Sequence, residues 1–286
     1  MTANSRNLFL RRSAAVLFAA LSLLLLTDLH AGVPLNNLQG GGGIAFNPLA
    51  YLAGRQLSKE GGVVTVPQAG AWHVELPDAN IRWDAVGAAF SLFGRLELSY
   101  GYSNLDAKDY GDNDINVHTL GLKVKLLEEN AFDTAWVPAV SVGATYGHTS
   151  AYTADLLGLD HDGTSFYVVA TKLITQLPLP VLVSAGVLRS DEVVYGAVGH
   201  NDHGTSFFAN LDVLPAPNVA LGVEFRQGID AGDGIQNSDY WDFHAAWFAT
   251  DKLTLVGAYA NTGDKDKGNK DLGVGDGFVL SAQYQF

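Results

Sequence analysis

Charged side chains occupy alternate positions within several apolar segments of the chain. Two charged residues that are separated by one position would share one face of a strand, because alternate residues of a strand point the same way. Groups of both signs facing a hydrated interior could select the solutes that pass, or could pair with one another and hold that interior shut. The candidate lumen-lining residues are Arg95, Glu97, Lys123, Lys125, Glu224, Arg226, Asp242 and His244. The same reasoning adds Arg82, Asp84, Lys172 and Asp212.

Histidines and acids in the polar connections offer a second kind of chemistry. The segments His161–Ser165 and Asp202–Ser206 share a Gly-Thr-Ser sequence beside a His-Asp or Asp-His pair, so a zinc or copper site is one interpretation. A shared strand-entry turn explains the repeat more simply. His148, Ser150 and Asp155 match no spacing of a catalytic triad. We therefore expect no catalytic residue, no metal site, no cofactor and no enzyme activity.

The composition excludes several classes of protein. The 17 basic and 30 acidic residues give a net charge of -13, and nucleic-acid partners need a basic surface, so we expect none. With 48% hydrophobic and 16% charged residues, the chain can bury enough surface to fold. The absence of cysteine excludes a disulfide-stabilised scaffold and thiol catalysis.

The first segment has the pattern of an export signal. Arg6, Arg11 and Arg12 precede an apolar run at 14–26, which is shorter than the ~20 residues that a helix needs to cross a bilayer. This arrangement is typical of a cleaved secretory signal peptide. We therefore expect residues 1–31 to be removed after Ala31 and the mature protein to leave the cytoplasm.

The rest of the chain alternates between apolar and polar residues with the period of β-strands. In the segment 240–249, Trp241 and Phe243 fall on one face and Asp242 and His244 on the other. Segments of this kind are ~10 residues long, as tilted strands that cross a membrane are. We expect about twelve of them, near 44–54, 81–90, 95–104, 115–126, 135–148, 164–175, 180–190, 204–214, 218–229, 239–249, 252–261 and 276–286.

The connections between these segments alternate between short and long. Outer-membrane barrels have this asymmetry, with short periplasmic turns and longer external loops. Hydrocarbon cannot satisfy an open sheet edge, so the strands must close on themselves. The sequence therefore predicts an all-β fold, a transmembrane antiparallel up-and-down β-barrel over residues 44–286. Aromatic residues near both strand ends, among them Tyr240, Trp241 and Trp247, would form the two interfacial belts.

The end of the chain resembles a known group of proteins. The last strand carries Phe278, Leu280, Tyr284 and a terminal Phe286, and it is similar to the C-terminal assembly signal of Gram-negative outer-membrane β-barrel proteins. Within that group, the Gly40–Gly43 run and the segment 92–99 resemble an uncharacterised barrel family classed as a domain of unknown function. The resemblance implies the barrel assembly machinery, periplasmic chaperones, outer-membrane lipid and lipopolysaccharide as partners, and it implies no catalytic residues.

These features together predict a protein of the cell outer membrane that acts as a passive channel or transporter for small solutes. The alternative is a closed structural or docking barrel, its lumen plugged by the Gly-rich segment 32–43 or by the connection 55–80. An outer-membrane hydrolase is a third, less favoured hypothesis. The sequence leaves the transported solute and the state of the lumen open.

Overall fold

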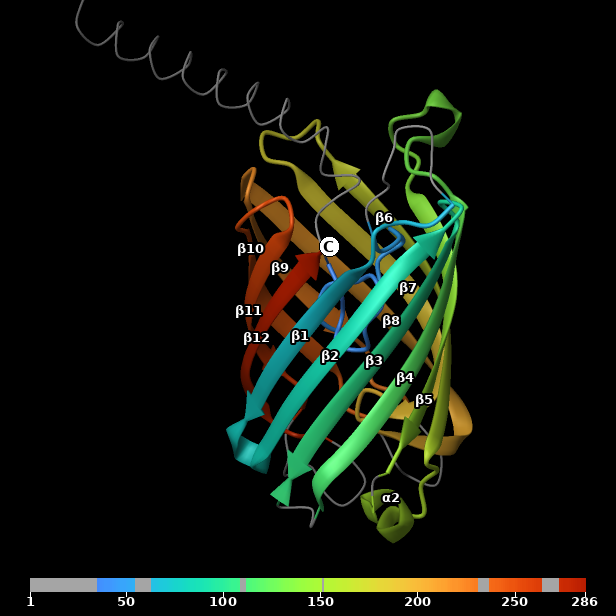
Figure 1. The fold of residues 1–286 in the computed structure, drawn as a ribbon, viewed down its shortest axis with the longest axis vertical. Helices are drawn as coiled ribbons and strands as arrows, with labels where there is room; N and C mark the ends of the chain where they lie inside the picture. The colour runs from blue at the N-terminus through green and yellow to red at the C-terminus, as the bar shows by residue number, and fades with distance from the viewer. Residues whose placement is uncertain (1–34, 55–62, 109–111, 151, 231–236, 264–272) are drawn as a thin grey trace, which may run out of the picture.

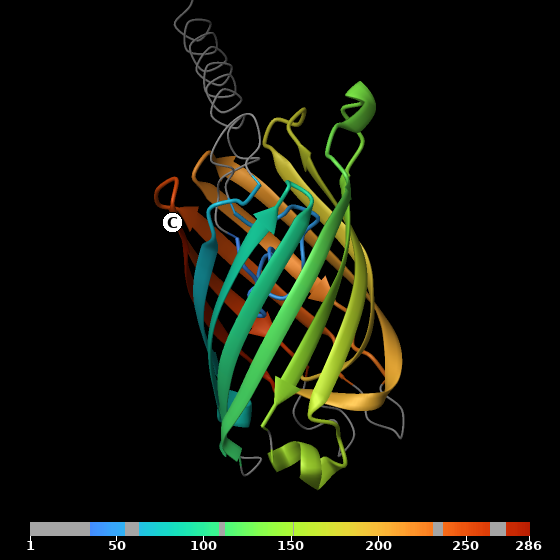
Figure 2. The ribbon, with the colours of Figure 1, turned by 45° about the vertical axis from the view of Figure 1, so that its right-hand side comes forward.

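The structure, a computed structural model, describes residues 35–54, 63–108, 112–150, 152–230, 237–263 and 273–286, so the expected signal peptide 1–31 lies outside the described residues. Within these ranges twelve antiparallel strands close into one barrel (Figure 1, Figure 2), which confirms the predicted fold. Each strand pairs with its neighbours in sequence, and β1 pairs with β12 to complete the cylinder. The strands are β1 (Gln68–Leu76), β2 (Ile81–Leu92), β3 (Leu96–Ala107), β4 (Asp112–Leu127), β5 (Ala139–Thr149), β6 (Asp162–Ile174), β7 (Val181–Val193), β8 (Val198–Ala216), β9 (Val219–Arg226), β10 (Tyr240–Phe248), β11 (Leu253–Asn261) and β12 (Asp276–Gln285).

The two ends of the barrel differ in their connections. Short turns such as 93–95 and 217–218 lie at the end that carries the C-terminus, which is uppermost in Figure 1. The opposite end carries the connection with the short helix α2 (Tyr152–Leu157) and the longer links 227–239 and 262–275. We call these the short-turn end and the long-loop end. No helix in the described part of the chain is long and apolar enough to cross a membrane.

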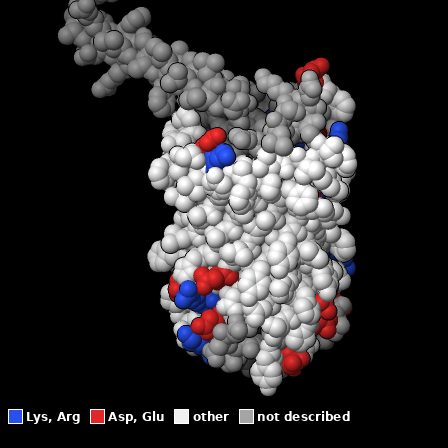
Figure 3. All heavy atoms as spheres, in the orientation of Figure 1, with Lys and Arg blue, Asp and Glu red and all other residues white. Residues whose placement is uncertain are grey.

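The outer surface of the barrel wall is mainly apolar. On the face drawn in Figure 3, most charged side chains gather toward the two ends, and the broad middle of the wall is mainly uncharged. Outward-facing Leu122 and Phe243 are among the exposed large hydrophobic residues. So are the four residues of the predicted assembly signal, which point outward along β12: Phe278, Leu280, Tyr284 and Phe286. An apolar exterior of this kind suits a hydrocarbon environment.

The first strand was wrongly predicted. Residues 44–54 form no strand of the barrel, and β1 begins at Gln68 instead. Pro48 lacks an amide hydrogen for a sheet ladder, and neighbouring amides bond to side chains of the wall. In β1 the apolar Trp72 and Val74 point inward, while polar His73 and Glu75 point outward. This reversal of the expected facing hid the strand from pattern analysis.

Residues 35–54 lie inside the barrel, where they appear as the blue segment enclosed by the strands in Figure 1 and Figure 2. We call this segment the plug. The amide of Asn36 donates to the Gln283 side chain on β12 at 2.8 Å. The amide of Ala50 donates to the Thr171 hydroxyl on β6, also at 2.8 Å. The plug therefore bonds to both sides of the wall.

Candidate functional site

Most of the predicted lumen-lining residues meet at the surface of the plug. Six of the eight are buried inside the barrel: Glu97, Lys123, Glu224, Arg226, Asp242 and His244. Lys125 lies near the short-turn end, where its ammonium is 2.8 Å from Glu128. Arg95 is exposed in the turn between β2 and β3, because β3 begins only at Leu96. Arg95 thus lies outside the lumen, contrary to the sequence-based prediction.

Glu97 on β3 and Lys123 on β4 form one contact with the plug. The register places the two residues opposite each other, and the Lys123 ammonium is 3.2 Å from the Glu97 carboxylate. Glu97 accepts the amides of Gly42 at 2.9 Å and Ala53 at 2.6 Å. Lys123 donates to the carbonyls of Gly42 at 2.8 Å and Tyr51 at 3.1 Å. A charge-balanced pair therefore binds plug backbone through both of its partners, and we call it the Glu97–Lys123 clamp.

Glu224 on β9 forms a second contact with the plug. Its carboxylate accepts the amide of Phe46 at 2.7 Å and that of Ala45 at 3.2 Å. Asn47 reinforces this contact, since its side-chain amide donates to Asn210 on β8 at 2.9 Å. Hydrogen bonds to a carboxylate are stronger than those between neutral groups, so Glu224 anchors the middle of the plug.

A histidine and two aspartates lie beside Glu224 on the same wall. His244 Nε2 is 2.7 Å from Asp212 Oδ1, and His244 Nδ1 is 2.7 Å from Asp242 Oδ1. Gly222 on β9 stands between Asp212 and His244 in the register. A Cβ at this glycine would lie 2.3 Å from Asp212 Oδ1 and 2.5 Å from His244 Nε2. The glycine therefore lets the two side chains meet across β9. We call Asp212, Glu224, Asp242 and His244 the acidic cluster.

The long-loop end of the lumen is closed by an apolar cluster. Tyr195, in the link between β7 and β8, packs edge-on against Phe46 of the plug at 5.4 Å between ring centroids and donates a hydrogen bond to the Phe46 carbonyl. Trp83 and Tyr240 pack around the same pair. Tyr240 therefore faces inward and does not belong to the outer aromatic belt predicted from the sequence.

The link that carries Tyr195 is strained. Val194 and Tyr195 have φ of 48° and 54°, a conformation that β-branched and bulky residues rarely adopt. Such strain persists only where surrounding contacts hold it. The Arg226 guanidinium, 4.9 Å from the centre of the Tyr195 ring, is one of those contacts.

Lys172 on β6 belongs to a third contact, near the short-turn end. Its ammonium is 2.9 Å from Glu129 Oε1, and Glu129 Oε2 accepts the hydroxyl of Tyr51 in the plug at 2.9 Å. Burial raises the pKa of the Tyr51 hydroxyl, and the neighbouring Glu129 carboxylate raises it further. Tyr51 therefore stays protonated and remains a donor.

Arg82 and Asp84 point away from the lumen. Both are exposed on the outer surface of β2, next to His73 on β1, and Asp84 Oδ1 is 2.6 Å from His73 Nδ1. The inward positions of β2 are taken instead by Trp83 and Ala85, which pack on the apolar cluster. The prediction that Arg82 and Asp84 line the lumen is therefore wrong.

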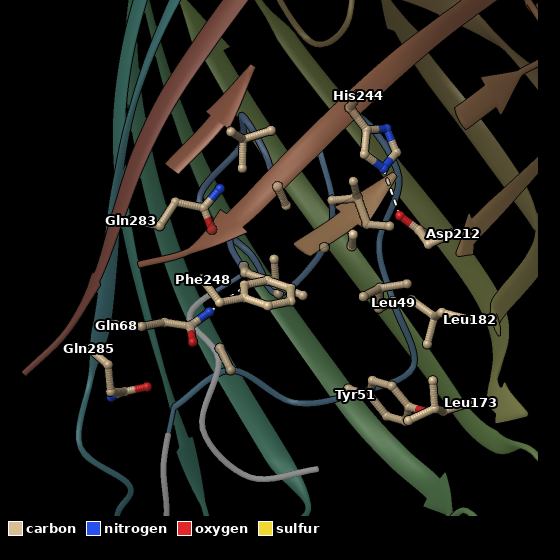
Figure 4. Close-up of a pocket in the computed structure, with 18 of the residues that line it drawn as sticks. Leu49, Tyr51, Gln68, Leu173, Leu182, Asp212, His244, Phe248, Gln283 and Gln285 are labelled. Atoms are coloured by element: carbon tan, nitrogen blue, oxygen red, sulfur yellow. Dashed lines mark hydrogen bonds and ion pairs between the residues drawn. The ribbon is translucent and has the colours of Figure 1, made fainter. Parts of the chain in front are cut away.

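A cavity of about 130 Å³ remains between the plug and the wall. Figure 4 shows it enclosed by Leu49 and Tyr51 of the plug and by Leu173, Leu182 and Phe248 of the wall, with Asp212 and His244 at its margin. Gln68, Gln283 and Gln285 line the β1–β12 side. The cavity lies toward the short-turn end, opposite the Phe46–Tyr195 closure.

The two histidine-containing repeats meet where Thr164 Oγ1 lies 3.2 Å from His203 Nε2, but their histidines bond to different carboxylates. His161 Nε2 is 3.1 Å from Asp155 Oδ1, whereas His203 Nε2 is 3.4 Å from Asp191. In the described ranges no three His, Asp or Glu side chains are arranged to hold a metal ion. The hydrogen bond to Asp155 raises the pKa of His161, which lies in the connection before β6.

The glutamines of the interior were not singled out in the sequence. Gln283 on β12 accepts the Asn36 amide at 2.8 Å and donates to the Asn36 carbonyl at 3.2 Å. Gln68 donates to the Leu35 carbonyl at 2.9 Å. Polar residues at alternate positions of the last strand already marked an inward face. The signal for a plug was the Gly40–Gly43 run, in which a Cβ at Gly40 would lie 2.4 Å from the carbonyl oxygen of Tyr100 on β3.

The closed cylinder and its apolar exterior define an outer-membrane β-barrel that resembles small porins. The fold is similar to those of the KdgM porin (TM-score 0.53, 9% identity, covering 77% of this chain and 99% of that chain) and of the NanC porin (0.49, 9%, 77% and 98%). It is also similar to the outer membrane protein Omp33 of Acinetobacter baumannii (0.43, 12%, 79% and 100%).

The chain belongs to the DUF3034 family, described as a protein of unknown function, whose model matches residues 32–276. This result confirms the resemblance inferred from the sequence. A comparison with curated proteins finds no match. At 9% identity, the similarity to the KdgM porin indicates the fold alone.

Proposed function

We propose that the protein is a gated outer-membrane channel for small hydrophilic solutes, closed at rest by its own plug. The supporting observation is that buried ionic groups of the wall bond to plug backbone. Glu97 and Lys123 hold Gly42, and Glu224 holds Phe46. Without the plug these groups would face an empty lumen that water can enter. The barrel therefore carries the polar lining that a passage needs, and the plug covers it.

A second candidate is a permanently closed barrel that serves as a structural or docking element. The observation that favours it is the number of separate contacts that hold the plug, from Gln283 on β12 to Thr171 on β6. Under this hypothesis the plug is a part of the core and never moves. Both hypotheses leave the protein without enzyme activity, and removal of a signal peptide over 1–31 remains part of either proposal.

Conductance in planar lipid bilayers separates the two candidates. We expect the mature protein to open rarely and a variant that lacks residues 35–54 to conduct steadily. Glu97→Gln combined with Glu224→Gln should increase the open fraction without shortening the chain. Asp84→Asn, on the outer surface, is the matched control and should behave like the unmodified protein. Heat-modifiable migration on gels shows whether each variant forms an intact barrel. If both lumen variants are folded by this criterion and neither conducts, the channel hypothesis is ruled out.

The charge of the lining gives a second test. If solutes pass along the uncovered wall, replacing Glu224 should change the selectivity of the deletion variant between cations and anions, because fixed charges in a pore select ions. The deletion variant is the right background, since its wall is not covered. Unaltered selectivity would place the conducting path elsewhere.

A further inference from the structure

The cavity between plug and wall has one apolar side and one ionic end. Successive inward-facing residues of β10, from His244 through Ala246 to Phe248, run along it toward the short-turn end. On β8, Asp212 and Leu214 also line the cavity, with Leu214 nearer the short-turn end. Leu173 and Leu182 complete the apolar side. In Figure 4 the Asp212–His244 pair, Leu173 and Leu182 border the same space.

One carboxylate oxygen at the ionic end has no hydrogen-bond donor among the described residues. Asp212 Oδ1 is bonded to His244, but Asp212 Oδ2 is buried with no partner in the described structure. The Asp212 side chain is only 5% exposed. A buried carboxylate oxygen without a donor is unfavourable, and this one belongs to a residue that lines the cavity.

The charge around the cavity is not balanced. The acidic cluster contains three carboxyl groups, of Asp212, Glu224 and Asp242, and one imidazole. The hydrogen bond between Glu224 and Asp242 requires one proton between those two groups. His244 can donate from both ring nitrogens only as an imidazolium, which still leaves one carboxylate in excess. The next inward cation on β9, Arg226, is turned toward the Tyr195 ring at the opposite end of the plug. The cluster therefore favours a positively charged occupant.

We propose that this cavity binds a small organic cation with an apolar body. Its ammonium group donates to Asp212 Oδ2, and its body packs against Leu173, Leu182 and Phe248. The volume of about 130 Å³ is close to the ~150 Å³ of cavities that admit a benzene ring, which limits the ligand to about one ring and a short amine arm. The site goes beyond the proposed channel function, since it requires no movement of the plug.

Benzylammonium is a suitable probe, because it has this size and charge. Its binding to the full mature protein in detergent is measured by isothermal titration calorimetry, with benzoate and benzyl alcohol as matched ligands of negative and zero charge. We expect one saturable site for benzylammonium. Loss of a charge-assisted hydrogen bond in the buried site should weaken the binding of the other two by about tenfold or more.

Two variants test the two halves of the site. Asp212→Asn should weaken benzylammonium binding by about tenfold or more. Ala246→Leu fills the apolar side, leaves Asp212 in place, and should also abolish binding. Asp84→Asn on the outer surface should leave it unchanged. If Asp212→Asn does not fold, Ala246→Leu still decides the question.

Three results would overturn the proposal: no saturable binding of benzylammonium, equal affinity for benzoate, or folded Ala246→Leu protein with unchanged affinity. Because the readout is equilibrium binding, it is independent of conductance. A barrel that binds benzylammonium but never conducts would support this site and contradict the channel. A barrel that conducts but does not bind benzylammonium would support the channel and contradict this site.

Discussion

The Glu97–Lys123 clamp and the acidic cluster hold the same plug in different ways. In the clamp, one carboxylate and one ammonium are 3.2 Å apart, and each of them bonds to plug backbone. In the cluster, Glu224 alone holds the plug, while Asp212 keeps a buried oxygen without a partner in the described structure. The first arrangement satisfies its charges and the second does not. We infer that the clamp stabilises the plug and that the cluster is where a ligand or a change of state can act.

The largest expected effect is at the clamp. Lys123→Met leaves the Glu97 carboxylate buried without its cation, which typically destabilises a protein by about 3–5 kcal/mol. Urea unfolding in detergent, followed by tryptophan fluorescence, measures the change. The double variant Glu97→Gln with Lys123→Met removes both charges and should recover much of the loss. A double variant as unstable as the single one would contradict the balanced-pair interpretation.

Glu224→Gln should have the next largest effect, of about 2 kcal/mol, because hydrogen bonds to a charged acceptor become neutral ones. The loss should appear locally, as faster hydrogen exchange of the amides of Ala45 and Phe46, which bond to this carboxylate. Amides near Gly42 report on the clamp and serve as the internal control. Equal acceleration at both places would mean that the plug opens as one unit.

Asp242→Asn should stabilise the protein slightly, raising the free energy of unfolding by less than ~1 kcal/mol. The substitution reduces the excess of carboxylates, and the asparagine oxygen can still accept a hydrogen bond from His244 Nδ1. This outcome is opposite in sign to that of Lys123→Met, and the two are compared in the same urea titration. A loss as large as that at Lys123 would show that the acidic cluster is as tightly balanced as the clamp.

The smallest effect concerns the exposed pair His161–Asp155, which repeats the His–Asp chemistry of the cluster outside the lumen. The bond to Asp155 raises the pKa of His161 in the folded protein. The pair therefore stabilises the connection with α2 fully below the unfolded pKa of histidine, ~6.5, and this contribution disappears as the pH rises through the raised folded value. Water screens the pair, so we expect less than ~1 kcal/mol.

Nuclear magnetic resonance titration of the His161 ring measures this pKa directly. Asp155→Asn should lower it toward the ordinary histidine value, whereas Asp162→Asn, which removes a more distant carboxylate, should change it less. A titration curve unaffected by Asp155→Asn would refute the assignment of this pair.

Strand patterning predicted most of the wall because lipid imposes one rule on every strand: apolar residues face outward wherever hydrocarbon touches the barrel. The rule failed where a face meets something other than lipid or water. Trp72 and Val74 of β1 face the apolar cluster, and His73 and Glu75 face outward near the long-loop end, where the exterior is polar. Arg82 and Asp84 were misplaced for the same reason.

The plug could not be predicted from periodicity. Residues 35–54 have no regular repeat, and their amides bond to single side chains spread over the wall, such as Glu97 and Glu224. Those partners are 55 and 178 residues away from Gly42 and Phe46, and nothing local in the sequence specifies such pairs. Alternation placed Glu97, Lys123 and Glu224 on the inward face, where they are buried, but the sequence did not reveal which segment they bind.

The most direct test of the central claim is to fasten the plug to the wall and measure conductance. The chain has no native cysteine, and the Thr171 hydroxyl lies 2.8 Å from the Ala50 amide, so Ala50→Cys with Thr171→Cys introduces the sole thiol pair. We predict silence in planar bilayers when the pair is oxidised and channel openings after reduction. Equal conductance in the oxidised and reduced states, or silence in both, would contradict a plug that closes the lumen by staying in place.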